Sequence, residues 1–325
     1  MNQVKQIKIE IKKSCFLGLA FTLLSCLISC GSVPQKEVCA EYRALIINAD
    51  DLCQDRRTNE AILKCYNEGI VTSTTAFVNF PDSIELLKEV HEQYPDFPIG
   101  IHLNMTFGKP VLPPEEVPTM VNKKGEFWNE DQILTHIADI DYEEVKKEIR
   151  AQVEFFLSSG VPLDHIDYHH HMLALYTPYH QIVREIAVEY NVPVRNPVPV
   201  SAYGKIKVSS GGGASASISK LIIYGMLHPF KSIPMMKKVG VEAFIEQERI
   251  TNECGIKTPD WFVDVFYENS DKETFLSIID QLPDGVSEIM CHPGSSESEI
   301  KILTNPEIKA KIAEKEILLT DFSKI

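Results

Sequence analysis

Short apolar runs alternate with helical segments along most of this 325-residue chain, and this alternation limits the possible folds more than any other feature. The run at 44–50 (ALIINAD) is typical of a buried strand, and residues 56–69 after it carry apolar side chains at helical spacing. The same order returns with strand-like runs at 71–78, 98–104 and 165–171. Strands that alternate with helices pair in parallel, with the helices outside. About seven such units predict an α/β fold and favour a barrel over an open sheet.

The second half of the chain continues this pattern after one interruption. We expect further helices at 81–94, within 133–159, at 178–190 and 272–282 and near Glu307, a long rim loop at 107–129, and further strands at 192–195, 260–266, 287–290 and 317–320. Residues 196–242 break the pattern with prolines and the small-residue tract SSGGGASAS. We interpret them as an insertion in a single catalytic domain.

The first 29 residues are typical of a lipoprotein signal peptide. A lysine-rich start precedes the apolar run 15–29, which is too short for a comfortable bilayer span. The run ends in LISCG, which resembles a bacterial lipobox, so a lipid would be attached to Cys30. We expect a signal peptide at 1–29, a tether at 30–43 and the domain at 44–325. The protein would then be lipid-anchored in a bacterial cell envelope, facing the periplasm or the cell surface; ordinary secretion and an uncleaved anchor remain the alternatives.

Charge and cysteine spacing exclude two kinds of site. The net charge of -14 argues against nucleic acid as a partner, because phosphate binding needs a basic patch. The eight cysteines include no CxxC pair, which makes a cysteine zinc site improbable.

Four of the ten histidines lie within residues 165–171 (HIDYHHH), and such a cluster suggests metal ligation or acid/base chemistry. Neighbouring side chains of a strand point to opposite faces, so His165, Asp167 and His169 share one face. That polar face would line the barrel interior. We expect His169 to be a ligand and Asp167 to support it, with His170 facing away and His171 as the fallback ligand.

Other ionisable residues fall at the carboxyl ends of separate strands, where a barrel collects its chemistry. His102 turns inward by the same alternation. Asp50 and Asp51 cannot both point inward from a regular strand, so we expect the chain to bend there. His292 follows the late strand. Arg195 ends another strand and would either orient a carboxylate or substrate or form a structural ion pair.

One carboxylate and two imidazoles are a common metal-ligand set of hydrolases, with positions left open for water and substrate. A second carboxylate beside the metal can act as general base, and His292 could protonate the leaving group. Structural roles compete with each assignment. The paired aspartates could cap a helix, His102 could be a satisfied core histidine, and His292 could be a turn residue.

Five sequence blocks in order resemble the YdjC-like carbohydrate deacetylases, which include chitooligosaccharide deacetylases. The blocks are NADD at 48–51, GIVTSTT at 69–75, GIHLN at 100–104, HIDYHHH at 165–171 and CHPG at 291–294. They extend over most of the chain after the leader. The chain departs from the family where Leu52 and Cys53 replace a usual Phe-Gly pair after the aspartates.

This resemblance implies a distorted TIM-like (β/α) barrel of about seven strands. It also implies a metal-dependent hydrolase that removes acetyl groups from N-acetylated amino sugars or oligosaccharides. It implies Mg²⁺ or Zn²⁺ bound by Asp51, His102 and His169, and a metal-bound water that attacks the acetyl carbonyl. Asp50 would be the general base and His292 the general acid.

Supporting or substrate-binding roles would fall to Asp167, Arg195 and Asn104. A glycan-binding lipoprotein without turnover and a non-haem iron enzyme are the alternatives, and a homodimer is left open.

Overall fold

The computed structural model describes residues 35–38, 40–137, 139–207, 241–266 and 270–325. The expected signal peptide, Cys30 and residues 208–240 of the expected insertion lie outside these residues. Within the described ranges, no helix is both long enough and apolar enough to cross a membrane.

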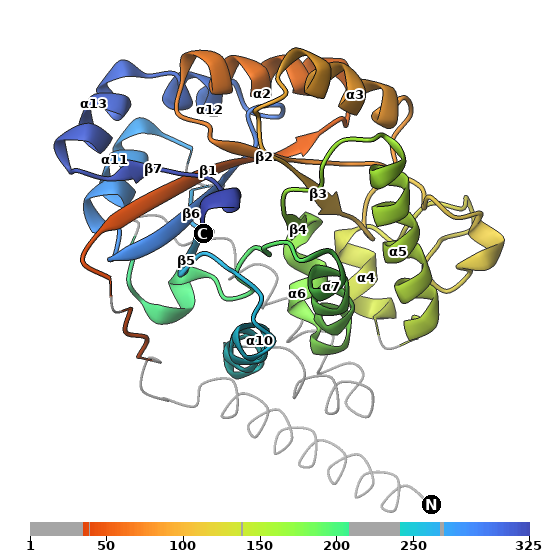
Figure 1. Cartoon of the computed structure of the whole chain (residues 1–325). Helices are drawn as coiled ribbons and strands as arrows, with labels where there is room; N and C mark the ends of the chain where they lie inside the picture. Colours follow the sequence, from red (N-terminus) through yellow and green to blue (C-terminus); the bar gives the residue numbers. More distant parts are fainter. Residues whose placement is uncertain (1–34, 39, 138, 208–240, 267–269) are drawn as a thin grey trace, which may run out of the picture.

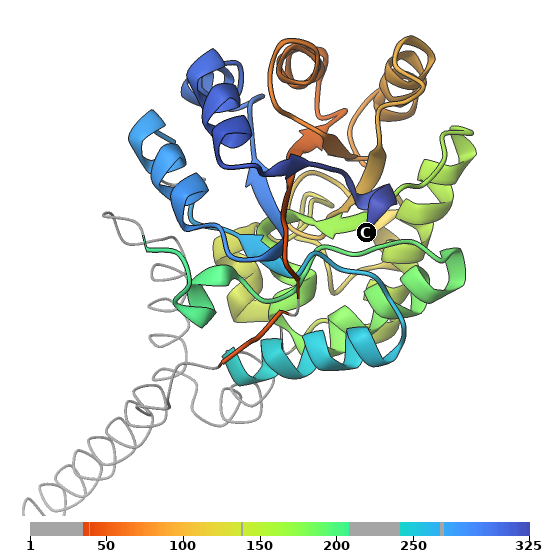
Figure 2. The same ribbon diagram turned by 60° about the vertical axis from the view of Figure 1, so that its left-hand side comes forward.

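Parallel strands form one curled sheet in the order β4-β3-β2-β1-β6-β5, with β7 paired to the start of β1. Figures 1 and 2 show this half-barrel with helices on its outer side. The strands are β1 (Arg43–Leu52), β2 (Ser73–Ala76), β3 (Ile99–Leu103), β4 (Ile166–Tyr168), β5 (Trp261–Val263), β6 (Gly285–Cys291) and β7 (Leu318–Leu319). The predicted distorted TIM-like architecture is confirmed.

The segment expected as a strand at 192–195 forms only single bridges. Val194 pairs with Ile166, and Pro199 pairs with Phe262, so this segment crosses the gap between β4 and β5. Prolines at 193, 197 and 199 explain the difference, because a proline has no N–H to donate to a strand ladder.

The helices begin and end close to the expected positions. They are α2 (Arg56–Glu68), α3 (Ser83–Gln93), α4 (Glu130–His136), α5 (Tyr142–Ser158), α6 (Met172–Leu175), α7 (Thr177–Tyr190), α10 (Val241–Glu253), α11 (Lys272–Gln281), α12 (Glu297–Leu303) and α13 (Pro306–Glu314). Side-chain caps set several starts; Asp55, for example, accepts a hydrogen bond from Thr58 N at the start of α2. The short α6 and α12 and the longer α10 were not expected.

Strand alternation sorts the residues of β1 between two environments. Leu45, Ile47 and Ala49 belong to the large apolar core against the helices. Ala44 and Ile46 face the other way, in a small apolar cluster completed by Val286 and Phe322. This cluster lies at the start of β1, so the strand's other inward positions, nearer its carboxyl end, are left for polar residues.

Candidate metal centre and active site

The end of β1 delivers two adjacent carboxylates to the barrel interior. Asp51 has a left-handed backbone (φ 74°), and the pairing of β1 with β2 is irregular between Ala49 and Leu52. The expected bend is therefore present, and it lets Asp50 and Asp51 both turn inward. A non-glycine residue in this conformation is uncommon and often marks a functional position.

Three metal-donor atoms, one each from Asp51, His102 and His169, form a donor group that brings together separate segments of the chain. Asp51 Oδ1 lies 3.4 Å from His102 Nε2 and 3.5 Å from His169 Nδ1, and the two histidine nitrogens are 3.2 Å apart. Asp51 Oδ1 is buried and lacks a hydrogen-bond partner among the described residues. Metal bonds of about 2.0–2.2 Å place neighbouring ligand atoms roughly 3–3.5 Å apart. The orphaned oxygen and the spacing together fit a divalent cation.

His169 reaches this place from a turn and not from a strand. β4 ends at Tyr168, and residues His169–His171 form a 3₁₀ turn in which His170 and His171 both have φ 53°. His170 is exposed; its ring lies 3.9 Å from that of His169, and its Nδ1 contacts Thr106 Oγ1. His171 packs beside Phe262 and does not belong to the donor group.

Asp167 controls which nitrogen of His102 faces the donor group. Asp167 Oδ1 lies 2.6 Å from His102 Nδ1, and Thr75 Oγ1 donates to Asp167 Oδ2 at 2.8 Å. When His102 is neutral, Asp167 favours its proton on Nδ1, so that Nε2 presents its lone pair towards Asp51 and His169. Burial alone would lower the pKa of His102, but the charge and hydrogen bond of Asp167 raise it to about 9. For Asp51, burial is outweighed by the neighbouring histidines, which lower its pKa to about 2.

Arg195 holds Asp50 with two parallel hydrogen bonds of 2.7 and 2.8 Å, and one of the same nitrogens lies 2.9 Å from Asp167. Arg195 therefore forms a buried ion pair and, in the same contacts, fixes the direction of the Asp50 carboxylate. Burial would raise the pKa of Asp50, but the Arg195 guanidinium outweighs it and holds that pKa well below its usual range.

Glu288, on β6, is a buried member of this network that the sequence reasoning missed. Arg195 Nε donates to Glu288 Oε1 at 2.7 Å, whereas Oε2 is without a partner in the described part of the chain. Burial raises the pKa of Glu288 to about 8, against the attraction of Arg195. A glutamate inside the otherwise uncharged run GVSEIMC was the available signal, because such a strand rarely buries an unpaired charge.

His292 stands beside Asp50 just after β6. Its Nε2 lies 3.9 Å from Asp50 Oδ2, and its backbone N–H donates to Glu299 Oε2 at 2.5 Å. Asp50 Oδ1 accepts from both Arg195 and Asn48, whereas Oδ2 accepts only from Arg195 among the residues that the structure describes. A carboxylate oxygen has two lone pairs, so Oδ2 keeps one available on the side of His292.

Asn104 lies apart from this group. Its side chain accepts from the backbone N–H groups of Thr106 and Phe107 and donates to Phe107 O and Asn79 Oδ1. All of its hydrogen-bonding capacity therefore shapes the loop after β3.

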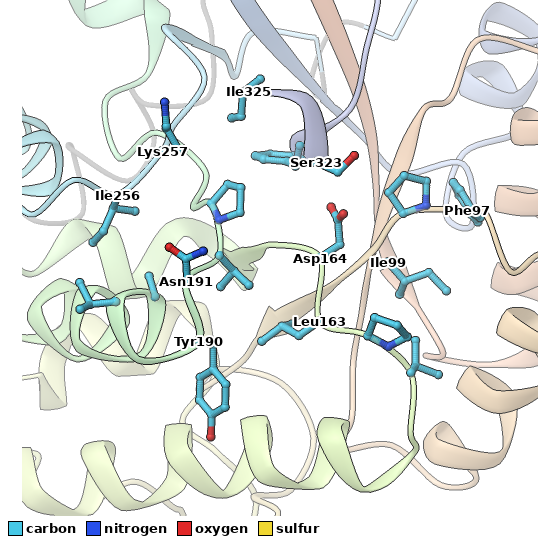
Figure 3. A pocket seen from close by; sticks show the side chains of 18 of the residues that line it. Phe97, Ile99, Leu163, Asp164, Tyr190, Asn191, Ile256, Lys257, Ser323 and Ile325 are labelled. Carbon is cyan, nitrogen blue, oxygen red and sulfur yellow. The ribbon is translucent and has the colours of Figure 1, made fainter.

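His165 faces the interior as expected, but it lies at the amino end of β4 and outside the donor group. Its Nε2 contacts Asn48 Oδ1 at 3.2 Å, its Nδ1 contacts Asp164 Oδ1 at 2.7 Å, and its ring stacks on Phe322. Beside Asp164 opens a cavity of about 760 Å³ at the amino ends of β3 and β4 (Figure 3). It has none of the donor-group residues in its lining.

The model of the YdjC-like protein family matches residues 44–314. The chain belongs to the YdjC-like family. Carbohydrate deacetylases of Thermoanaerobacter pseudethanolicus and Brevibacillus brevis are 30% and 31% identical to it, each covering 86% of this chain and 98% and 99% of their own length.

A crystal structure from Enterococcus faecalis V583, described as a candidate cellobiose-phosphate cleavage protein, superposes with a TM-score of 0.67. It is 27% identical and covers 87% of this chain and 99% of its own. The resemblance stated from the five sequence blocks is thereby confirmed.

Proposed function

We propose that this YdjC-like protein is a metal-dependent carbohydrate deacetylase that hydrolyses the acetyl amide of N-acetylated amino sugars or oligosaccharides. The observation that carries this proposal is the orphaned Oδ1 of Asp51, grouped with two histidine nitrogens beside an arginine-held Asp50. Relatives that align over 98–99% of their length and are named carbohydrate deacetylases supply the substrate class.

Asp51, His102 and His169 would hold the cation, which we propose to be Mg²⁺ or Zn²⁺. When bound, the cation would polarise the acetyl carbonyl and make the attacking water more acidic. Once His102 has lost one proton, Asp167 would keep the other on Nδ1, so that Nε2 is available as a ligand atom.

Asp50 accepts the proton of the attacking water at the available lone pair of Oδ2. Its low pKa makes it a weak base, so the attacking water has to be acidified before the transfer is favourable. Arg195 and Asn48 fix the direction of the carboxylate, which gives the general base one orientation.

His292 Nε2 donates the proton that the departing nitrogen needs. Its position 3.9 Å from Asp50 Oδ2 puts the acid and the base on adjoining sides of one site. The products are acetate and a free amino sugar.

An acetate-release screen tests this proposal. Metal-stripped and metal-restored protein would be compared on a panel of N-acetylated saccharides, with Mg²⁺, Zn²⁺ and Fe²⁺ restored separately. We expect acetate release only from metal-restored protein. Saccharide binding without acetate release would favour a glycan-binding protein, and oxygen consumption with Fe²⁺ would favour an oxygenase; either result would contradict the proposal.

We also propose, from the leader sequence, that Cys30 carries a lipid and anchors the protein in the cell envelope. In the bacterial host, the wild-type protein should fractionate with membranes and Cys30→Ser should not. Equal membrane association of both proteins would contradict the lipid anchor.

A further inference from the structure

Phe107 is an exposed aromatic residue beside the proposed metal ligands. It is 41% exposed, and its ring lies 5.9 Å from that of His169 at an interplanar angle of 24°. A single exposed phenylalanine needs no explanation by itself. Phe107 does need an explanation, because it lies next to a histidine of the donor group and its loop is firmly held.

The loop that carries Phe107 is pinned from both sides. Asn104 accepts the backbone N–H of Phe107 at 3.0 Å and donates to its carbonyl at 2.6 Å. Asn79, which follows β2, donates to the same carbonyl and to that of Lys109. The loop therefore holds the Phe107 ring rigidly, and the exposure of the ring is not a result of loose packing.

Phe107 is also the outer end of an aromatic wall that begins at the ligands. Phe77 is fully buried and its ring lies 4.9 Å from that of His102 and 5.0 Å from that of His169. Phe80 connects Phe77 to Phe107, with ring centroids 4.9 and 5.1 Å away. The wall therefore runs from the donor group to the surface and fixes the ring position of Phe107.

We propose that Phe107 is a sugar-stacking platform, on which the apolar C–H face of a pyranose ring rests while its acetyl group reaches the donor group. A pyranose ring presents several C–H bonds on one face, and an aromatic ring presents a negative π face to them. A rigid aromatic side chain loses little conformational entropy when it binds, so this contact is efficient.

This platform deepens the proposed function, on which it rests, by making a sugar ring part of what the site selects. Substrates without a sugar ring would have access to Asp50 and His292 but would gain nothing from Phe107. The platform should therefore affect acetylated saccharides and leave small acetyl compounds unchanged.

The test compares Phe107→Ala, Phe107→Tyr and Phe155→Ala. Phe155 on α5 is a matched control, because it is the same residue type and is 40% exposed. For N,N′-diacetylchitobiose we expect kcat/KM to fall about threefold to tenfold in Phe107→Ala and to stay within about twofold in the other two. For methyl acetate, which has no ring to stack on Phe107, all three should match wild type, and metal content should be unchanged. Equal losses on both substrates, or no loss on either, would overturn the platform.

A measurement of saccharide binding distinguishes failure of the platform from failure of the proposed reaction. Calorimetry would measure N,N′-diacetylchitobiose binding to metal-loaded Asp50→Asn, with and without Phe107→Ala. Weaker binding without Phe107, together with no acetate release by metal-loaded wild type, would uphold the platform and overturn the deacetylase. Acetate release by wild type with binding independent of Phe107 would do the reverse, and neither binding nor release would overturn both.

Discussion

Two histidine–aspartate pairs lie at opposite ends of the strands in this half-barrel: an upper pair, His102–Asp167, and a lower pair, His165–Asp164. They differ in what the second ring nitrogen of each histidine contacts. Near the carboxyl ends of the strands, His102 Nδ1 lies 2.6 Å from Asp167. At the amino end, His165 Nδ1 lies 2.7 Å from Asp164. The second nitrogen of His165 contacts Asn48 Oδ1. The second nitrogen of His102 instead faces Asp51 Oδ1, which has no hydrogen-bond partner in the described part of the chain, and a second imidazole nitrogen.

This difference separates a structural histidine from a candidate ligand. His165 is satisfied on both sides and stacked on Phe322, so it needs nothing more. In the upper group, once His102 has lost one proton, a carboxylate oxygen and two imidazole nitrogens meet at one point, which suits a divalent cation. The 760 Å³ cavity adjoins the lower pair (Figure 3). The proposed chemistry is therefore located by the grouped ligand atoms of the upper site and not by the size of a cavity.

The largest expected effect comes from Asp50, the proposed general base beside the candidate metal centre. Asp50→Asn should lower kcat by about 10²–10⁴-fold, because the general base is lost, while metal content stays near wild type. Steady-state acetate release and elemental analysis measure the two quantities. Loss of the metal in this variant would contradict the division of roles between Asp50 and Asp51.

The next largest effect is expected when the aspartate of each histidine–aspartate pair is replaced and metal affinity is compared. Asp167→Asn should weaken metal binding about 10–100-fold, because His102 loses the acceptor that fixes its tautomer. Asp164→Asn is the matched change in the lower pair, and it should leave metal affinity within about twofold. Metal affinity would be measured by competition with a chelator. Similar losses of affinity in both variants would contradict the distinction between a ligand-supporting pair and a structural pair.

The pKa of His102 predicts that metal binding displaces a proton. Because that pKa is raised to about 9 in the metal-free protein, His102 is protonated at pH 7 and must lose a proton to become a ligand. Metal affinity should rise with pH by up to about tenfold per unit between pH 6 and 8. Calorimetry in two buffers of different ionisation enthalpy should find close to one proton released. Binding that is independent of pH and buffer would contradict this.

The smallest expected effect is on the stability of the metal-free protein. The raised pKa values of His102 (about 9) and Glu288 (about 8) both favour the folded state at low pH, and this contribution is lost as pH rises through them. The free energy of unfolding should therefore fall from pH 6 to pH 9. Urea unfolding should show a smaller fall for Glu288→Gln, and an unchanged one for the exposed control Glu297→Gln. A fall of the wild-type size in Glu288→Gln would show that Glu288 does not contribute.

Periodicity predicted most of the fold, because helices and strands are local patterns. The half-barrel and the helices at 56–69, 81–94, 178–190 and 272–282 follow from apolar spacing and turn residues. The early end of β4 did not follow, because three consecutive histidines give no sign that two of them adopt positive φ.

The sequence predicted the positions of candidate-site residues that depend on strand alternation and strand ends. It did not predict those that depend on partners far away in the chain. The grouping of Asp51, His102 and His169 follows from strand ends meeting at one rim. The position of Arg195 depends on Asp50 and Glu288, which are 145 and 93 residues away, and single-sequence periodicity carries no information on such pairs. Asn104 carries no mark in the sequence to separate a loop-shaping amide from a substrate contact.

Metal titration of two histidine variants tests the central claim most directly. Zn²⁺ and Mg²⁺ would be titrated by calorimetry into metal-free wild type, His102→Gln and His165→Gln, with folding verified by circular dichroism. The claim predicts one tight site in wild type and His165→Gln and none in His102→Gln. Metal binding retained by a folded His102→Gln, or lost from a folded His165→Gln, would contradict it.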